Sequence, residues 1–160
     1  MLKPLIAALI ALMLATPTAV PAAAQNPPPP DERQAVLATV EGLFAAMLAR
    51  DGAAVTAMVE PQGIVTAITV APEGNRIAIS PWADFAARLA QAPGPIRERM
   101  FAPEVRINGD LAMVWSRYDL SIGDTFSHCG TDLFDLIRRD GRWRLLNATF
   151  TRERTGCEAR

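Results

Sequence analysis

Three tight-turn signals in the last third of the chain constrain the fold more than any other feature. They are Asn108-Gly109, Gly123-Asp124 and Asp140-Gly141. Such pairs favour two-residue hairpin turns, because these turns need a positive φ that Gly, Asn and Asp tolerate. The turns separate four strand-like runs. We therefore predict an antiparallel meander with strands over about 97–107, 110–121, 125–138 and 142–152.

The segment before the meander predicts two helices. Asp31 and Gln34 have the spacing of a capping box, with Asp31 as the N-cap residue. Apolar residues then recur at helical spacing as far as Leu48 and predict one buried helix face. Asp51-Gly52 ends this helix and begins a short second one, which stops at Pro61.

A strand pair and a third helix complete the predicted order of elements. Residues 63–71 are rich in β-branched side chains, and a turn leads into an extended piece that ends near Ile79. Ser80-Pro81 predicts the start of a helix, with Ser80 as N-cap and Pro81 in the first helical position. Helices that precede an antiparallel meander predict an α+β domain.

The first 24 residues are typical of a cleaved export signal. Lys3 supplies a positive start, the apolar run from Leu5 to Ala15 is too short to span a bilayer, and Ala22-Ala23-Ala24 resembles a signal-peptidase site. An uncleaved membrane anchor is the alternative. We expect a Pro-rich linker over 25–30, one domain over 31–157, a tail over 158–160, and a periplasmic or secreted protein with no membrane contact after cleavage.

Charge and cysteine content exclude several functions. Lys3 is the only lysine, so the mature chain has 15 arginines and 17 acidic residues, a net charge of −2 that gives no reason to expect nucleic acid as a partner. Cys129 and Cys157 are an even pair in an exported chain and predict a disulfide, with two free thiols as the alternative. With one histidine and two cysteines, no metal and no cofactor are expected.

The order of motifs resembles the nuclear transport factor 2-like superfamily. The motifs that carry the resemblance are Gly109-Asp110-Leu111-Ala112, the strand with Trp115 and Tyr118, Asp140-Gly141-Arg142-Trp143, and Thr149-Phe150-Thr151. The chain is most similar to the exported branch called putative lumazine-binding, near the SnoaL-like and ketosteroid isomerase-like proteins, over Asp31 to Cys157. This resemblance implies a cone-shaped curved antiparallel sheet wrapped around N-terminal helices. Members of this fold include isomerases, dehydratases and plain binding modules.

Two-residue turns without bulges would pair Asp119 with His128, Trp115 with Asp132, and Phe134 with Asn147. Such pairing predicts one sheet face that is apolar at one end and polar at the other, as a cone with an open mouth requires. The predicted face also contains Glu98. The candidate ligand-binding residues on it are Trp115, Arg117, His128, Asp132, Phe134, Asn147 and Thr149.

His128 is the sharpest catalytic candidate, because a carboxylate at Asp119 or Asp132 would orient the imidazole as a general base. A structural ion pair is the alternative interpretation. A single bulge would reverse the faces, and the cavity would then contain Ser116, Tyr118, Thr131 and Asp135 instead. The ketosteroid isomerase-like mechanism is not expected, since the segment from Pro61 to Pro72 lacks the carboxylate base that this mechanism uses.

The sequence favours an exported domain that binds a small, partly apolar molecule without converting it, and that forms a homodimer through the sheet. One alternative is an acid–base enzyme of the dehydratase or hydrolase type that uses His128. Another is a structural or protein-interaction module whose cavity is filled by its own side chains.

Overall fold

The computed structural model describes residues 30–157, and the predicted signal peptide and tail lie outside them. The elements run in the order α1 (Pro30–Ala49), α2 (Gly52–Met58), β1 (Ile64–Thr69), β2 (Arg76–Pro81), α3 (Trp82–Ala90), β3 (Ile96–Asn108), β4 (Leu111–Ile122), β5 (Thr125–Arg139) and β6 (Arg142–Arg152). The α+β class and the predicted element order are confirmed. In this part of the chain, no helix is long and apolar enough to cross a membrane.

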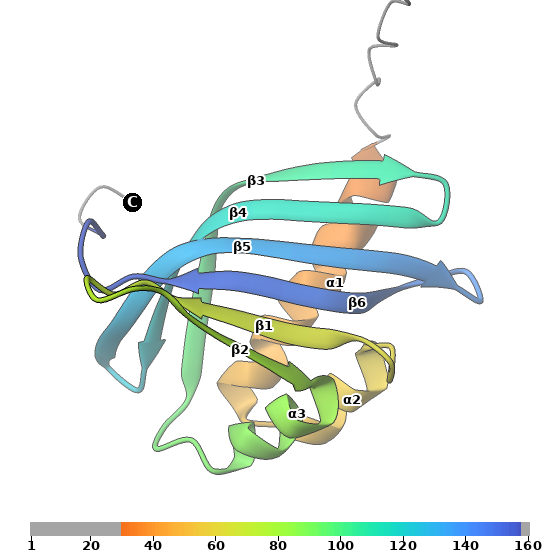
Figure 1. The fold of residues 1–160 in the computed structure, drawn as a ribbon. Helices are drawn as coiled ribbons and strands as arrows, with labels where there is room; N and C mark the ends of the chain where they lie inside the picture. Colours follow the sequence, from red (N-terminus) through yellow and green to blue (C-terminus); the bar gives the residue numbers. More distant parts are fainter. Residues whose placement is uncertain (1–29, 158–160) are drawn as a thin grey trace, which may run out of the picture.

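The six strands form one open sheet in the order β2-β1-β6-β5-β4-β3. The meander β3 to β6 is antiparallel as predicted, and its strand ends fall within one residue of the predicted ones. β1 joins the meander by a parallel pairing with β6 and carries β2 at the sheet edge. The sheet bends strongly, and the three helices lie on its concave side (Figure 1).

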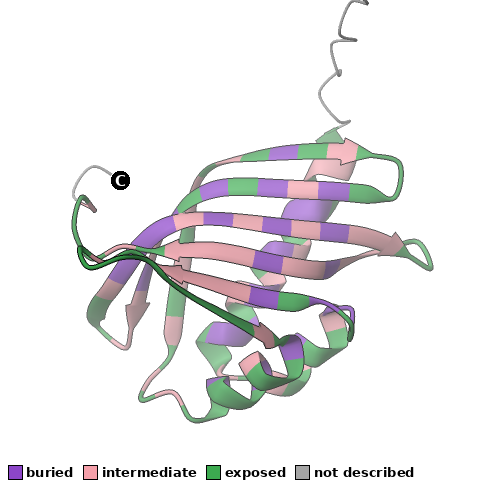
Figure 2. Ribbon diagram, in the orientation of Figure 1, coloured by how far each residue is buried: buried purple, intermediate pink, exposed green. Residues whose placement is uncertain are grey.

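Alternate strand residues are buried against the helices (Figure 2). The centre of this core lies between α1 and the middle of the sheet, where Val36, Val40 and Leu43 meet Val114, Leu136 and Leu145. Each buried aliphatic side chain of this size contributes about 1.5–3 kcal/mol relative to an exposed one. The helical spacing of apolar residues in α1 therefore identifies, from the sequence, the helix face that packs against the sheet.

The helix starts differ in detail from the predicted ones. Asp51 is an N-cap as predicted, and its Oδ1 accepts a hydrogen bond of 2.9 Å from the Ala54 amide. Asp31 is not an N-cap, because α1 already begins at Pro30. It lies in the first turn, where a carboxylate still favours the helix dipole. Pro81 rather than Ser80 is the N-cap of α3, and Ser80 accepts a hydrogen bond from Arg88 instead.

Three β-bulges interrupt the meander, and they make the bulge-free pairing wrong. Ala102 and Pro103 form a bulge opposite Ser116, Ser127 is an extra residue in β5, and Leu146 is an extra residue in β6. A bulge shifts the pairing by one residue, so it changes which side chains share a face. The predicted pairing Leu136–Leu145 is correct, because it lies before the third bulge.

Side chains satisfy the backbone groups that two of the bulges leave outside the ladder. Ser116 Oγ accepts from the Phe101 amide and donates toward the Phe101 and Arg117 carbonyls at 2.8–3.1 Å. The Leu146 carbonyl accepts a hydrogen bond of 2.8 Å from Trp82 Nε1, which fixes α3 against β6. Unpaired buried backbone groups are costly, so these contacts allow the sheet to bend.

Charged contacts fix both ends of the helical layer. Glu32 on α1 forms a two-point ion pair with Arg138, whose guanidinium also lies 4.5 Å from the centre of the Trp143 ring. Beyond α2, the buried Glu60 binds Arg144 and Arg139. These arginines lie at the end of the sheet where β5 turns into β6.

Gly130 is required where β5 passes Tyr118. A Cβ at this position would overlap the Thr151 carbonyl oxygen and would lie 2.8 Å from Tyr118 Cε1. The same carbonyl accepts a hydrogen bond of 2.7 Å from the Tyr118 hydroxyl. Gly130 thus leaves the space in which the tyrosine ring lies on the sheet.

We predict that Gly130→Ala lowers the free energy of unfolding by about 3 kcal/mol, because backbone must move to relieve the overlap. Gly42→Ala is the control. Its Cβ would meet only the end of the Met58 side chain, at an ordinary 3.7 Å from the methyl group, and alanine in a helix interior gains about 0.5–1 kcal/mol over glycine. Urea denaturation measures both changes. Equal effects of the two substitutions would contradict the close packing at Gly130.

Candidate functional site

The concave side of the sheet contains a cavity of about 150 Å³ between the strands, α1 and α3. Every strand except β2 contributes to its wall, and most of the wall is apolar. The apolar side chains include Leu43, Met47, Trp82, Phe85, Leu120, Phe134, Ala148 and Phe150. An apolar cavity of this volume is large enough for a molecule the size of one six-membered ring.

Five polar side chains interrupt the apolar wall: Glu98, Tyr118, His128, Asp132 and Arg152. Asp132 and Glu98 form the central pair, and they come from β5 and β3, with β4 between them. Asp132 is 2% exposed, and its carboxyl group is hydrogen-bonded to that of Glu98. Two carboxyl groups form such a bond only when they share a proton.

The burial of this pair keeps the shared proton bound. Loss of solvent raises the pKa of the Asp132 carboxyl, and its bond to Glu98 opposes that shift only in part. Burial and the nearby charge of Asp132 raise the pKa of Glu98 well above its ordinary value. At neutral pH the cavity therefore holds a carboxylic acid that is able to donate a hydrogen bond.

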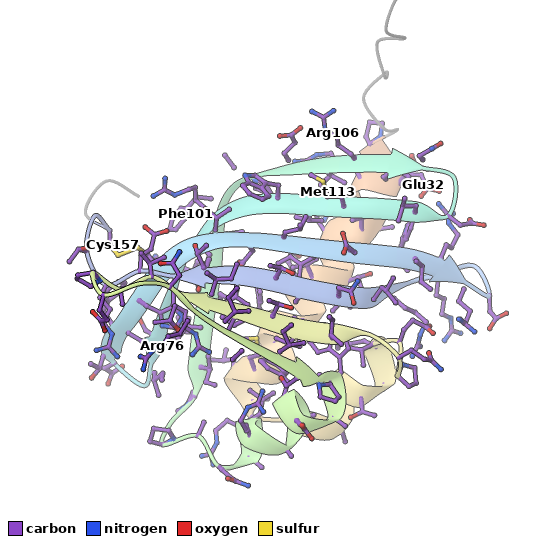
Figure 3. All side chains as sticks on the ribbon, in the orientation of Figure 1. Glu32, Arg76, Phe101, Arg106, Met113 and Cys157 are labelled. Carbon is purple, nitrogen blue, oxygen red and sulfur yellow. A yellow bond between two sulfur atoms is a disulfide. The ribbon has the colours of Figure 1, made fainter. Side chains whose placement is uncertain are left out.

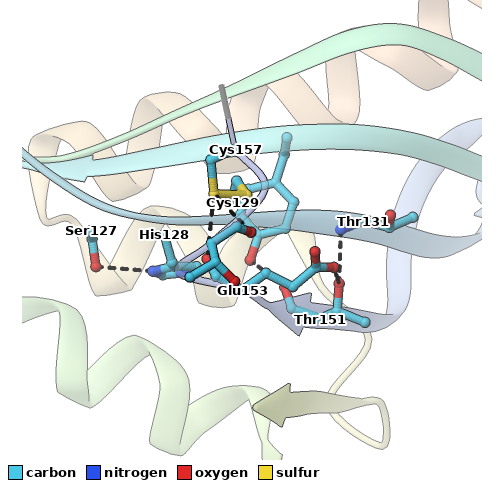
Figure 4. The surroundings of a disulfide bond; sticks show 9 residues. Ser127, His128, Cys129, Thr131, Thr151, Glu153 and Cys157 are labelled. Carbon is cyan, nitrogen blue, oxygen red and sulfur yellow. Dashed lines mark hydrogen bonds between the residues drawn. A yellow bond between two sulfur atoms is a disulfide. The ribbon is translucent and has the colours of Figure 1, made fainter. Parts of the chain in front are cut away.

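His128 stands near the cavity mouth and is 9% exposed. Its Nδ1 is hydrogen-bonded to Ser127 Oγ at 2.9 Å (Figure 4), and its ring meets Tyr118 edge-on. Burial and the positive charges of Arg152 and Arg154 lower the pKa of His128 to about 4. The imidazole is therefore neutral at pH 7.

Two polar atoms of this cavity lack a hydrogen-bond partner. Among residues 30–157, three buried side-chain polar atoms have none, and two of the three are Asp132 Oδ2 and His128 Nε2. A buried polar atom without a partner costs about 1–3 kcal/mol. Both atoms belong to residues of the cavity wall, so a bound molecule is able to supply the missing bonds.

The cavity opens toward the end of the sheet that holds the β4–β5 turn. Ile122, His128 and Arg152 line both the cavity and an adjoining surface cleft of about 620 Å³. Arg154 and Arg76 belong to this cleft. Arg76 and the C-terminal Cys157 lie at the same end of the sheet, far from Glu32 (Figure 3).

A disulfide holds the C-terminal segment beside the cavity mouth. Cys129 and Cys157 are bonded, which confirms the predicted pairing. The backbones of Cys129 and Glu153 exchange hydrogen bonds of 2.8 and 3.0 Å, so β6 continues along β5 past its regular end (Figure 4). The backbone bonds fix Glu153, which lies between Arg152 and Arg154.

The structure brings together only part of the predicted site. His128, Asp132 and Phe134 line the cavity. The other candidates lie on the outer face, where Trp115 is 48% exposed and Asp119 forms an ion pair with Arg99. These outward residues are Trp115, Arg117, Asp119, Asn147 and Thr149.

The bulges at Ser127 and Leu146 explain these corrections. They shift the pairing so that His128 lies opposite Leu120 instead of Asp119, Asp132 opposite Ser116 instead of Trp115, and Phe134 opposite Ala148 instead of Asn147. The reversed face is also wrong in part. Ser116 and Tyr118 point inward, as that alternative required, but Thr131 and Asp135 do not.

Sequence reasoning missed two members of the site. Arg152 lies beyond the pairing of β6 with β5, and its place at the mouth comes from the parallel pairing of β6 with β1. Glu98 was on the predicted face, but its contact with Asp132 arises from the bend of the sheet, which turn signals do not encode.

Among the described residues, no group of three or more His, Cys, Asp or Glu side chains is placed to hold a metal ion.

We predict that wild-type stability falls as the pH rises from about 6.5 through about 7, the raised pKa of Asp132. The folded pKa values of Glu98 and Asp132 are raised, so the stability they contribute is complete below their ordinary pKa values and is lost as the pH rises through the folded ones. The slope reaches about 1.4 kcal/mol per pH unit for one proton. His128 acts with the opposite sign, because its lowered pKa removes stability only as the pH falls below about 6.5.

Asp132→Asn should flatten the profile above pH 6.5, and Asp124→Asn in the exposed β4–β5 turn serves as the matched control. Chemical denaturation at half-unit pH intervals measures the slopes. If the Asp132→Asn profile matched the wild-type profile, the shared proton would be ruled out.

Comparison with known proteins supports the fold. A search of curated proteins found no match. A Nostoc punctiforme protein with a cystatin-like fold matches at TM-score 0.64 and 10% identity, over 81% of this chain and 97% of that one. A nuclear transport factor 2-like protein from Cytophaga hutchinsonii matches at TM-score 0.64 and 15% identity, over 76% and 98%.

A third solved structure is a putative dehydratase of the same fold from Streptomyces avermitilis. It matches at TM-score 0.60 and 16% identity, over 78% of this chain and 99% of that one. The family described as "Putative lumazine-binding" matches residues 31–151, which is most of the chain. The chain therefore belongs to this family, and its fold is that of the nuclear transport factor 2-like proteins.

Proposed function

We propose that the protein binds a small, partly apolar molecule in the cavity between α1, α3 and the sheet. The supporting observation is the pair of unpartnered polar atoms, Asp132 Oδ2 and His128 Nε2, in an otherwise apolar wall. A cavity filled by its own side chains would leave no such space. The family match supports small-molecule binding in general and does not name the ligand.

We also propose that the protein works outside the cytoplasm. The disulfide between Cys129 and Cys157 supports this location, because such bonds persist in oxidising compartments. The homodimer through the sheet stays a prediction. Two large apolar side chains of the outer face support it, since Trp115 is 48% and Leu111 is 54% exposed.

Filling the cavity tests binding directly. Ala148 is 4% exposed and lines the cavity, whereas its neighbour Thr149 lies on the outer face. We predict that Ala148→Leu keeps or raises the thermal stability, because the new methyl groups enter existing space, and that it abolishes binding. Thr149→Leu is the control and should bind like the wild type.

Phenol is a suitable neutral probe, measured by calorimetry and thermal shift. Native mass spectrometry of the protein isolated from its own cells provides the second readout, since a natural ligand would co-purify. If neither phenol nor a panel of ring-sized molecules bound, and no molecule co-purified, the binding proposal would fail.

Acid–base catalysis is the second candidate function. Asp132 as a proton donor and neutral His128 as a base line one cavity, and the Streptomyces avermitilis neighbour is described as a putative dehydratase. Asp119 is not available for this role, because it pairs with Arg99 on the outer face.

We predict that any dehydration of small hydroxy compounds would fall by about 10²–10⁴-fold in Asp132→Asn, since one positioned proton donor contributes about that much. Asp119→Asn should retain the full rate. Product formation over a panel of ring-sized hydroxy acids measures this. Absence of turnover by the wild type, or equal losses in both variants, would count against catalysis.

A further inference from the structure

We propose that the ligand of this cavity is a small ring carboxylate, with its ring in the cavity and its carboxylate bound by Arg152 and Arg154 at the mouth. This inference rests on the proposed binding function and adds the charge and the orientation of the ligand. It also assigns a role to two arginines that contribute nothing to the core.

The surface outside the cavity mouth is positively charged. Arg76, Arg152 and Arg154 line the adjoining cleft, and Glu73 is the only carboxylate among its lining residues. Within residues 30–157, no carboxylate lies within ion-pair distance of Arg152 or Arg154. A planar guanidinium presents several donors that match a carboxylate, so this surface favours an anion.

Arg152 joins the cleft to the cavity. It lines the cavity, the cleft, and a groove between β2 and α3. Its guanidinium lies 5.1 Å from the centre of the Phe150 ring, and this cation–π contact holds it against the cavity wall. A carboxylate bound there would leave the rest of the molecule pointing toward Phe150 and Asp132.

The inner end of the cavity requires a different group. Asp132 Oδ2 lacks a hydrogen-bond partner there, and the wall around it is apolar, whereas the unpartnered His128 Nε2 lies nearer the mouth. A ring with a hydroxyl group opposite its carboxylate would satisfy both ends. A cationic ligand fits less well, because it would have to pass the arginines, and the Glu98–Asp132 pair already holds a proton in place of a cation.

Matched ligands separate charge from shape. We would measure binding of 4-hydroxybenzoate, its neutral analogue 4-hydroxybenzamide, and the cation tyramine by calorimetry at pH 7. The expected order places the carboxylate first, at least about tenfold tighter than the amide, because a charge-assisted bond is stronger than a neutral one. Because added salt screens surface charge, about 0.5 M salt should reduce the preference for the carboxylate over the amide.

Arg152→Gln should weaken the binding of 4-hydroxybenzoate about tenfold and change the affinity for 4-hydroxybenzamide by less than about twofold. Arg142→Gln, at the distant β5–β6 turn, is the control and should change neither affinity. Thermal unfolding verifies that both variants fold. Equal binding of acid and amide, or preferred binding of tyramine, would overturn this inference and leave the binding function intact. Failure of all three ligands and of phenol would overturn the binding function itself.

Discussion

The bends of the sheet depend on side chains that take up backbone groups at the bulges. Ser116 hydrogen-bonds the Phe101 backbone beside the bulge at Ala102 and Pro103, and Trp82 donates a hydrogen bond to the Leu146 carbonyl. Without these bonds, buried amides and carbonyls would favour a flatter, regular ladder. Curvature creates the concave face, so the cavity depends on these hydrogen bonds at the bulges of its own wall.

Curvature also explains why two carboxyl groups meet in an apolar interior. Burial of one carboxylate is costly, and burial of two beside each other is worse. Glu98 and Asp132 avoid this cost by keeping a proton between them. A core built for stability alone would place apolar side chains at both positions. Their presence in a wall that also contains unpartnered polar atoms is the main reason to regard this region as a site.

The sequence predicted the elements well and the faces poorly, for one physical reason. Turns such as Asp140-Gly141 need glycine at a positive φ and are therefore visible in the sequence, so strand ends were accurate to one residue. The bulges at Ser127 and Leu146 need no special residue there. Each moved the side chains beyond it to the other face, which kept His128 and Asp132 in the cavity and removed Asp119, Asn147 and Thr149.

The disulfide between Cys129 and Cys157 gives the two halves of this site different requirements. The cavity walls are held by apolar burial and exist in any compartment where the chain folds. The segment that carries Arg154 is exposed and is fastened at Cys157 by a bond that forms only under oxidising conditions. A reduced chain would thus keep its pocket and the position of Arg152 in β6, but the segment that carries Arg154 would lose its covalent anchor. The positive charge at the entrance would then be less ordered in reducing surroundings than in oxidising ones.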